Sequence, residues 1–188
     1  MSNPVLNDKQ RHAMERAVHM DALTCFRLNR LIRNGGTVHQ FFSVVSRLGD
    51  GVLWYSMMLA MPLFFGAHGF VITAAMLLTA ALGVWIYRLI KKRSMRPRPF
   101  VSYRAIKQGA RTLDQFSFPS GHTMHAVAFT VLLVPVIPIL GFFLVPFAIL
   151  TGLARVVLGL HYPSDVLMGA LLGVANAILI LTIFSGFL

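Results

Sequence analysis

The chain has 188 residues, of which 56% are hydrophobic and only 12% are charged. Soluble domains carry about 25% charged residues, so this composition excludes an ordinary soluble domain. The formal net charge of +11 is concentrated, because nine of the seventeen Lys and Arg residues lie between residues 88 and 111, with long apolar stretches on both sides. A short loop between membrane helices is a poor platform for nucleic acid, so a nucleic-acid partner is not expected.

The first fifty residues are mostly polar and mixed in charge. Residues 1–20 are expected to be frayed, whereas residues 22–32 predict an amphipathic helix that ends at the Gly35-Gly36 pair. Its apolar and arginine-bearing sides favour a position in the lipid headgroup region. A helix packed on the body of the protein is the alternative. Residues 41–45 are apolar but precede Arg47 and Asp50, so whether residues 38–50 extend the first membrane span stays open.

Beyond residue 50 the chain is predicted to form membrane helices. Residues 51–87, 115–154 and 166–188 contain no Asp, Glu, Lys or Arg. A helix needs roughly 20 apolar residues to cross a bilayer. With breaks at residues 66–69 and 135–138, the expected spans are residues 51–66, 69–90, 121–136, 138–157 and 165–187. The predicted fold class is all-α, a polytopic bundle of about five transmembrane helices, with an N-terminal segment at 1–50 and a membrane domain at 51–188.

Three polar clusters lie at the ends of these spans, at residues 91–99, 119–122 and 155–165. Ionisable groups beside membrane helices are costly and are functional by default. The first two clusters are on the loop after the second span, and the next two spans form a hairpin that returns to the same side. All three clusters are therefore predicted to meet at one membrane surface.

The residue types in these clusters suit a phosphate. Lys91, Arg98 and Arg155 can neutralise its charge, and arginine matches its oxygens in a bidentate fashion. Pro119 presets the first turn of a helix, so the N–H groups of Ser120 and Gly121 can bind an anion at the helix N-terminus.

His161 and Asp165 form the most informative pair. Pro163 marks a helix start, so Asp165 falls in the first turn, where the helix dipole keeps it ionised. An ionised Asp can hold one ring N–H of His161 and leave the other nitrogen as a nucleophile for phosphorus. His122, in the second cluster, can protonate the departing alkoxide as a general acid.

Together these motifs resemble the type 2 phosphatidic acid phosphatase superfamily, which includes the vanadium haloperoxidases and the microsomal glucose-6-phosphatases. Its three motifs correspond here to Lys91 with Arg98-Pro99, to Pro119-Ser120-Gly121-His122, and to Arg155 with His161 and Asp165. Ala154 stands where the third motif usually has Ser. The resemblance implies that His161 attacks, Asp165 orients it and His122 protonates the leaving group. It also implies a phosphate held by Lys91, Arg98, Ser120, Gly121 and Arg155, with no metal or other cofactor.

The predicted function is therefore an integral membrane lipid phosphatase that hydrolyses a terminal phosphate of a phospholipid or polyprenyl (di)phosphate through a phosphohistidine. A lipid phosphotransferase with the same site stays open, because the sequence does not separate water from an alcohol as acceptor. A small transporter is disfavoured, because polar groups collect at one face instead of lining the spans. Expected partners are the lipid phosphate and membrane lipids, and the sequence leaves the oligomeric state open.

The remaining charges bear on topology. The turns at 66–69 and 135–138, on the other side of the predicted membrane from the basic loop, contain no Lys or Arg. The positive-inside rule then favours a cytoplasmic site in a bacterial inner membrane. Arg96 and the other basic loop residues are interpreted mainly as topology or headgroup charges.

His125 is interpreted as a packing or supporting residue. The single cysteine, Cys25, excludes an intrachain disulfide and a cysteine-rich metal site.

Overall fold

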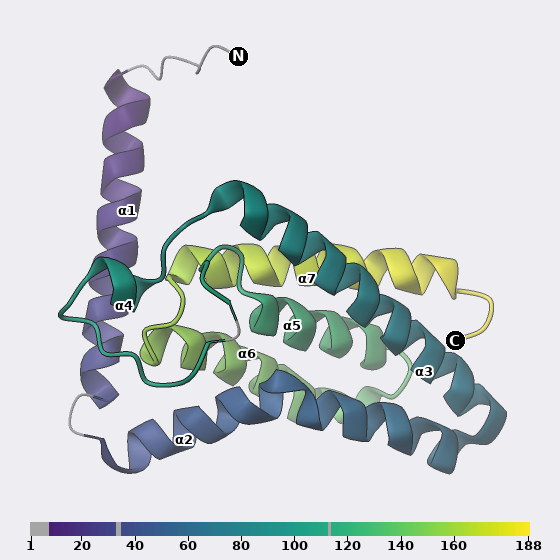
Figure 1. The fold of residues 1–188 in the computed structure, drawn as a ribbon. Coiled ribbons are helices and arrows are strands. Elements are labelled where there is room, and N and C mark those ends of the chain that lie inside the picture. Colours follow the sequence, from purple (N-terminus) through teal and green to yellow (C-terminus); the bar gives the residue numbers. More distant parts are fainter. Residues whose placement is uncertain (1–7, 33–34, 113) are drawn as a thin grey trace.

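The structure, a computed structural model, describes residues 8–32, 35–112 and 114–188, and this part of the chain is helical with no strands. The N-terminal elements are α1 (Asp8–Asn29), a 3₁₀ turn η1 (Arg30–Ile32), α2 (Gly36–Arg47) and a π-helical turn η2 (Leu48–Val52). The remaining elements are α3 (Leu53–Ser94), α4 (Pro99–Ser102), α5 (Gly121–Leu133), η3 (Pro138–Leu140), α6 (Gly141–Val157) and α7 (Pro163–Ile183). Figure 1 shows α3, α5, α6 and α7 forming the bundle, with α4 and the loops that flank it at one end.

The predicted all-α membrane bundle is confirmed. Three apolar helical stretches are long enough to cross a membrane, at Gly36–Ser94, Pro138–Val157 and Pro163–Ile183, and a shorter apolar helix covers Gly121–Leu133. The first stretch reverses at Gly66 (φ 55°), so it forms two arms of a hairpin. Residues 38–50 lie in α2 and η2, which continue into α3 across a kink at Gly51, so they belong to the same apolar helical stretch as the first predicted span.

Helix α5 lies at the centre of the bundle and packs against α3, α6 and α7. Its side chains are buried on several sides, including Met124, Phe129 and Leu133. Between lipid-embedded helices, association depends on close packing and small residues more than on the hydrophobic effect. A Cβ atom at Gly169 of α7 would lie 2.5 Å from the Ser120 carbonyl oxygen, so only glycine allows α7 to approach the start of α5 this closely.

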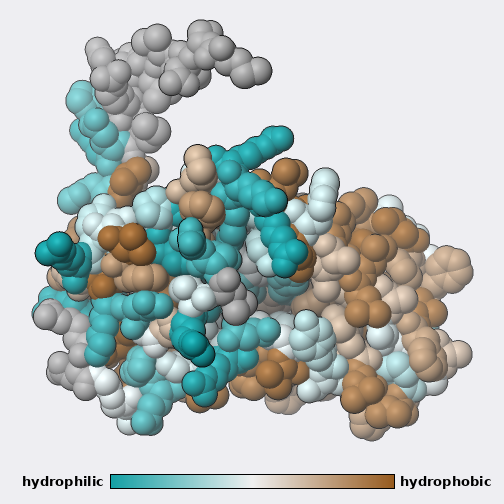
Figure 2. Space-filling view, viewed as in Figure 1, coloured by the Kyte–Doolittle hydropathy of each residue, from teal (hydrophilic) through white to brown (hydrophobic). Residues whose placement is uncertain are grey.

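The outer surface of the bundle suits lipid rather than water. Large apolar side chains point outward, among them Leu63 (76% exposed), Phe64 (80%) and Phe142 (78%). Figure 2 shows apolar residues covering the part of the molecule away from α1, whereas hydrophilic residues gather at the end that carries α1 and α4. The protein is therefore an integral membrane protein with one strongly polar end.

Helix α1 crosses that polar end instead of running along the bundle (Figure 1). Cys25, Asn29 and Ile32 are buried, and Asn29 Nδ2 donates to the carbonyls of Lys107 and Val157, each at 2.9 Å. Of the two alternatives, residues 22–32 therefore pack on the body. The expected fraying of residues 1–20 is wrong from Asp8 onward, where α1 begins, and residues 1–7 lie outside the described residues.

Candidate active site

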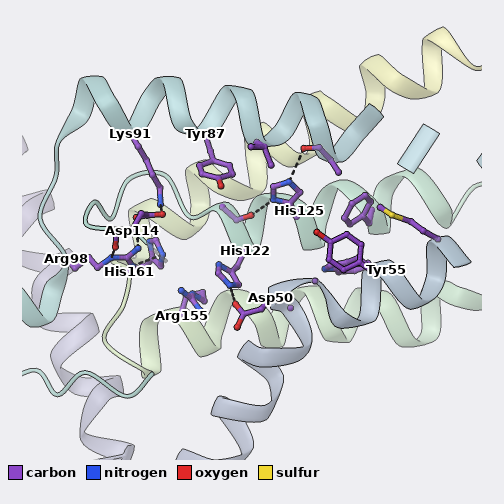
Figure 3. A pocket seen from close by; sticks show the side chains of 18 residues that line it. Asp50, Tyr55, Tyr87, Lys91, Arg98, Asp114, His122, His125, Arg155 and His161 are labelled. Carbon is purple, nitrogen blue, oxygen red and sulfur yellow. Dashed lines mark hydrogen bonds and ion pairs between the residues drawn. The ribbon is translucent and has the colours of Figure 1, made fainter. Parts of the chain in front are cut away.

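A cavity of about 220 Å³ opens at the polar end of the bundle (Figure 3). Six of the eight predicted site residues line it, namely Lys91, Arg98, Gly121, His122, Arg155 and His161. They come from α3, the loop before α4, α5, α6 and the turn between α6 and α7. The other two, Ser120 and Asp165, are fully buried behind the wall. The structure thus brings the three sequence clusters together as the topology predicted.

His161 follows α6 and is 1% exposed. Its Nε2 lies 3.2 Å from Arg98 Nη1, and because arginine can only donate, Nε2 acts as the acceptor. Burial, followed by the positive charges of Arg155 and Arg98, lowers the pKa of His161 well below its usual range. The ring is therefore neutral, with its proton on Nδ1 and its Nε2 lone pair on the cavity side.

Asp165 lies close to His161 in the first turn of α7. Its Oδ2 is 3.6 Å from His161 Nδ1, which is longer than a hydrogen bond, and Nδ1 has no hydrogen-bond partner among the described residues. The carboxylate instead accepts the Tyr162 N–H at 2.8 Å and Arg96 Nη1 at 2.6 Å. Catalytic hydrogen bonds are often long before substrate binds, so a small movement suffices to complete the pair.

The interpretation of Arg96 as a topology or headgroup charge is wrong. Its guanidinium binds Asp165 at 2.6 Å, Ser164 Oγ at 2.7 Å and Asp21 Oδ2 at 2.7 Å, and it stacks on the Tyr162 ring at 4.0 Å from the centroid. Asp21 also accepts the Ser164 N–H at 2.9 Å. Arg96 therefore ties α1 to the start of α7 and fixes the carboxylate beside His161.

Lys91 and Arg98 share a carboxylate that the sequence analysis missed. Asp114 Oδ2 lies 2.7 Å from Lys91 Nζ, and its Oδ1 lies 2.8 Å from Arg98 Nη2. Burial alone raises the pKa of Asp114, but the hydrogen bonds and charges of these two cations outweigh burial and lower it. An ionised carboxylate thus bonds to both cations predicted to hold phosphate, and a phosphate has to share their N–H donors with it or displace it.

The start of α5 differs from the prediction at Ser120. Its N–H, expected to bind phosphate, donates to the Asp165 carbonyl at 3.0 Å, and its hydroxyl pairs with Thr123 Oγ1 at 2.9 Å. The first bond joins α5 to α7, and Gly121 and His122 are the residues of this helix start that line the cavity. A role of the Ser120 N–H as phosphate ligand is not supported by this geometry.

Arg155 retains donors for a ligand. It is 2% exposed, its Nη1 donates to Ser46 Oγ at 2.6 Å, and its Nε has no partner among the described residues. A buried guanidinium with a free donor beside a cavity is suited to an anion.

His122 has a partner that the sequence analysis also missed. Its Nε2 is hydrogen-bonded to Oδ1 of Asp50, which comes from η2 (Figure 3). The available signal was an acidic residue between two glycines at the start of an apolar span, where an ionisable group is functional by default. His125, one turn further along α5, bonds the Gly121 carbonyl at 2.8 Å and lines the cavity.

A metal site was not expected from the sequence. Within the described part of the chain no group of three or more His, Cys, Asp or Glu gathers as a metal ion requires. The expectation of metal-free chemistry stays a prediction.

Comparison with known proteins gives several matches. A family model described as the PAP2 superfamily matches residues 71–187. Undecaprenyl-diphosphatase BcrC of Bacillus subtilis is 38% identical over 90 residues, covering 48% of this chain and 46% of that protein. Decaprenylphosphoryl-5-phosphoribose phosphatase of Mycobacterium tuberculosis is 38% identical over 87 residues, covering 45% of this chain and 46% of that protein. The chain thus spans about half the length of these relatives.

Two solved structures resemble the whole bundle. A transmembrane PAP2-type phosphatidylglycerolphosphate phosphatase from Bacillus subtilis has a TM-score of 0.74 at 24% identity, covering 90% of this chain and 87% of that one. Aquifex aeolicus LpxE has a TM-score of 0.65 at 27% identity, covering 83% of this chain and 93% of that one. At this level of identity the first likeness concerns the fold alone.

Proposed function

The chain belongs to the PAP2 superfamily, and from this premise we propose that it is a membrane phosphatase that hydrolyses a terminal phosphate of a lipid. The observation that carries the proposal is the convergence of two histidines and three cations on one cavity, from segments between residues 91 and 161. The relatives' names, which include undecaprenyl-diphosphatase and phosphatidylglycerophosphatase B, support a lipid phosphate as substrate.

The first chemical step is transfer of the phosphoryl group to His161. The Nε2 lone pair forms a bond to phosphorus while the bond from phosphorus to the lipid oxygen breaks, and that oxygen takes a proton from His122. The Asp165 carboxylate offsets the positive charge that develops on the His161 ring. Lys91, Arg98 and Arg155 stabilise the charge on the transferring phosphoryl oxygens.

The second step releases phosphate. Water attacks phosphorus and gives a proton to the now neutral His122, and the bond between phosphorus and Nε2 breaks with its electron pair returning to the ring. Inorganic phosphate leaves, and both histidines are restored. No other reactant is required.

The walls of the cavity support a lipid substrate. Beyond the charged groups the lining continues with Trp54, Met58, Val84 and Phe129 from the two arms of α3 and from α5. A charged end joined to an apolar wall at the membrane surface matches a molecule with a phosphate head and a hydrocarbon tail.

The proposal is tested by phosphate release from a panel of lipids in detergent. The purified protein is expected to release inorganic phosphate from at least one of phosphatidic acid, phosphatidylglycerophosphate, a polyprenyl diphosphate and a lipid A phosphate. The activity is expected to persist in EDTA, because the residues named above supply the acid, the nucleophile and the charge. Loss in EDTA with recovery in Mg²⁺ contradicts the metal-free mechanism. A phosphorylated alcohol without free phosphate identifies a phosphotransferase instead.

We also propose that the site faces the cytoplasm, because the basic residues cluster at the end that holds it. Single cysteines at Ser102 and Ala67, both exposed and on opposite sides of the predicted bilayer, test this with an impermeant thiol reagent on intact cells. Ala67 is expected to label and Ser102 to stay unlabelled, and the reverse pattern overturns the orientation. The native cysteine does not interfere, because burial, with the charges of Asp21 and Asp165, raises the pKa of Cys25 to about 12.

A further inference from the structure

The π-helical turn η2 interrupts the first membrane span directly beside the cavity. Gly51 within it has φ 133°, and a Cβ atom there would lie 2.7 Å from the Tyr55 ring. This backbone conformation strongly favours glycine, and it kinks the chain between α2 and α3. The turn presents Asp50 to the cavity, where its carboxylate bonds His122 Nε2 (Figure 3).

Gly49, the residue before Asp50, lies close to His122, the proposed general acid. A Cβ atom at Gly49 would lie 3.4 Å from Thr151 of α6 and 4.0 Å from Cδ2 of His122. These are ordinary van der Waals distances, so η2 lies directly against both the His122 ring and α6. The turn at residues 49–51 thus holds the Asp50 carboxylate at the membrane face, where a charged group without a function is costly.

Asp50 is the carboxylate available to His122. Asp165 is held by Arg96, and Asp114 is held by Lys91 and Arg98. A general acid must carry a proton, and an imidazolium inside a cavity that also contains three cations requires a neighbouring negative charge. The hydrogen bond that Nε2 donates to Asp50 fixes the ring and leaves Nδ1 of His122 for the substrate.

We propose that Asp50 is the positioning residue of the general acid, holding the His122 ring so that Nδ1 delivers its proton to the leaving oxygen. This inference rests on the proposed phosphatase function. It gives the site two Asp–His pairs on opposite sides of the phosphate, one for the nucleophile and one for the acid, each following the orientation logic of catalytic triads. Asp50 lies outside the three sequence motifs.

The test exploits the difference between leaving groups. Benzyl phosphate leaves as an alkoxide and needs the proton, whereas p-nitrophenyl phosphate leaves as a stabilised phenolate and needs it little. The value of kcat/KM for each reports the first phosphoryl transfer. Asp50→Asn is expected to lower kcat/KM for benzyl phosphate by about 10²-fold and that for p-nitrophenyl phosphate by less than about fivefold, within the range of general acid catalysis.

Three further variants and one control separate positioning from a merely structural role. His122→Ala is expected to show the same split, and Asp50→Asn added to His122→Ala is expected to cost little more, because both remove one function. Asp50→Glu keeps the charge, so the ratio of its two kcat/KM values is expected to lie nearer to the wild-type ratio. If the Asn variant fails to fold, Asp50→Glu takes its place in the comparison. Glu15→Gln on the exposed part of α1 is the control for loss of a carboxylate.

Equal losses for both substrates, or multiplicative losses in the double variant, overturn the positioning role while leaving the phosphatase proposal intact. A wild-type protein that hydrolyses neither these esters nor any lipid phosphate overturns both.

Discussion

His161→Ala is expected to abolish phosphate release, lowering kcat by roughly 10⁴-fold or more, as loss of a nucleophile does in other covalent enzymes. Water held elsewhere in the cavity lacks the position and the lone pair that Nε2 supplies. The measurement is phosphate release from the preferred lipid, together with acid-labile labelling from a ³²P substrate, which is expected in the wild type and absent in the variant.

The fold is expected to survive this substitution. Arg98 loses one contact, but its guanidinium keeps the Leu160 carbonyl at 2.8 Å and Asp114 at 2.8 Å. His68→Ala provides the matched control, since that histidine is exposed near the hairpin bend at Gly66 and does not line the cavity. If purified His161→Ala keeps more than a few per cent of the activity while remaining folded, the phosphohistidine mechanism is wrong.

The parts of the site that were predictable from sequence are those with local signatures. Lys91, Arg98, His122, Arg155 and His161 stand at fixed spacings next to apolar spans, and hairpin topology alone returns those spans to one face. Sequence patterns carry this information because membrane crossings have a nearly fixed length. The same reasoning gave the helical bundle and the approximate positions of its spans.

The carboxylates that complete the site have no such signature. Asp50 is separated from His122 by 72 positions, and Arg96 is separated from Asp165 by 69. Each pairing depends on how helices rotate and where a turn bulges, which charge patterns along the chain do not specify. For the same reason the sequence analysis treated Arg96 as one basic loop residue among nine, although tertiary packing makes it the partner of a catalytic candidate.

The hydrogen-bond partner of the Ser120 N–H is another contact that the sequence pattern does not specify. A Pro-Ser-Gly segment before an apolar helix predicts free N–H groups at the helix start. In the structure one of these groups is already used by the Asp165 carbonyl across the junction of α5 and α7. Which N–H groups remain for a ligand is decided by the neighbouring helix, and that neighbour comes from a different part of the chain.

Asp165→Asn is expected to lower kcat by about 10³- to 10⁴-fold without abolishing turnover, which is the scale seen when the Asp of a catalytic triad becomes Asn. The amide cannot offset the charge that develops on His161 during phosphoryl transfer. Its NH₂ group can also turn toward Nδ1 and favour the wrong tautomer. Arg96 keeps Asp21 and Ser164 as partners, so the change is expected to act on catalysis more than on folding.

Arg96→Gln tests whether the ion pair between Arg96 and Asp165 serves catalysis or only folding. If Arg96 holds the carboxylate in place, Arg96→Gln alone lowers kcat by less than Asp165→Asn does, and it adds little when Asp165 is already Asn, because the two residues act through one carboxylate. The four proteins of this cycle are compared by kcat and by thermal unfolding in the same detergent. An Asp165→Asn protein that stays within about tenfold of wild-type kcat contradicts the orienting role, since the triad analogy requires a far larger loss. An Arg96→Gln protein with wild-type kcat, together with non-additive losses in thermal stability across the cycle, instead assigns the Arg96 and Asp165 pair to folding alone.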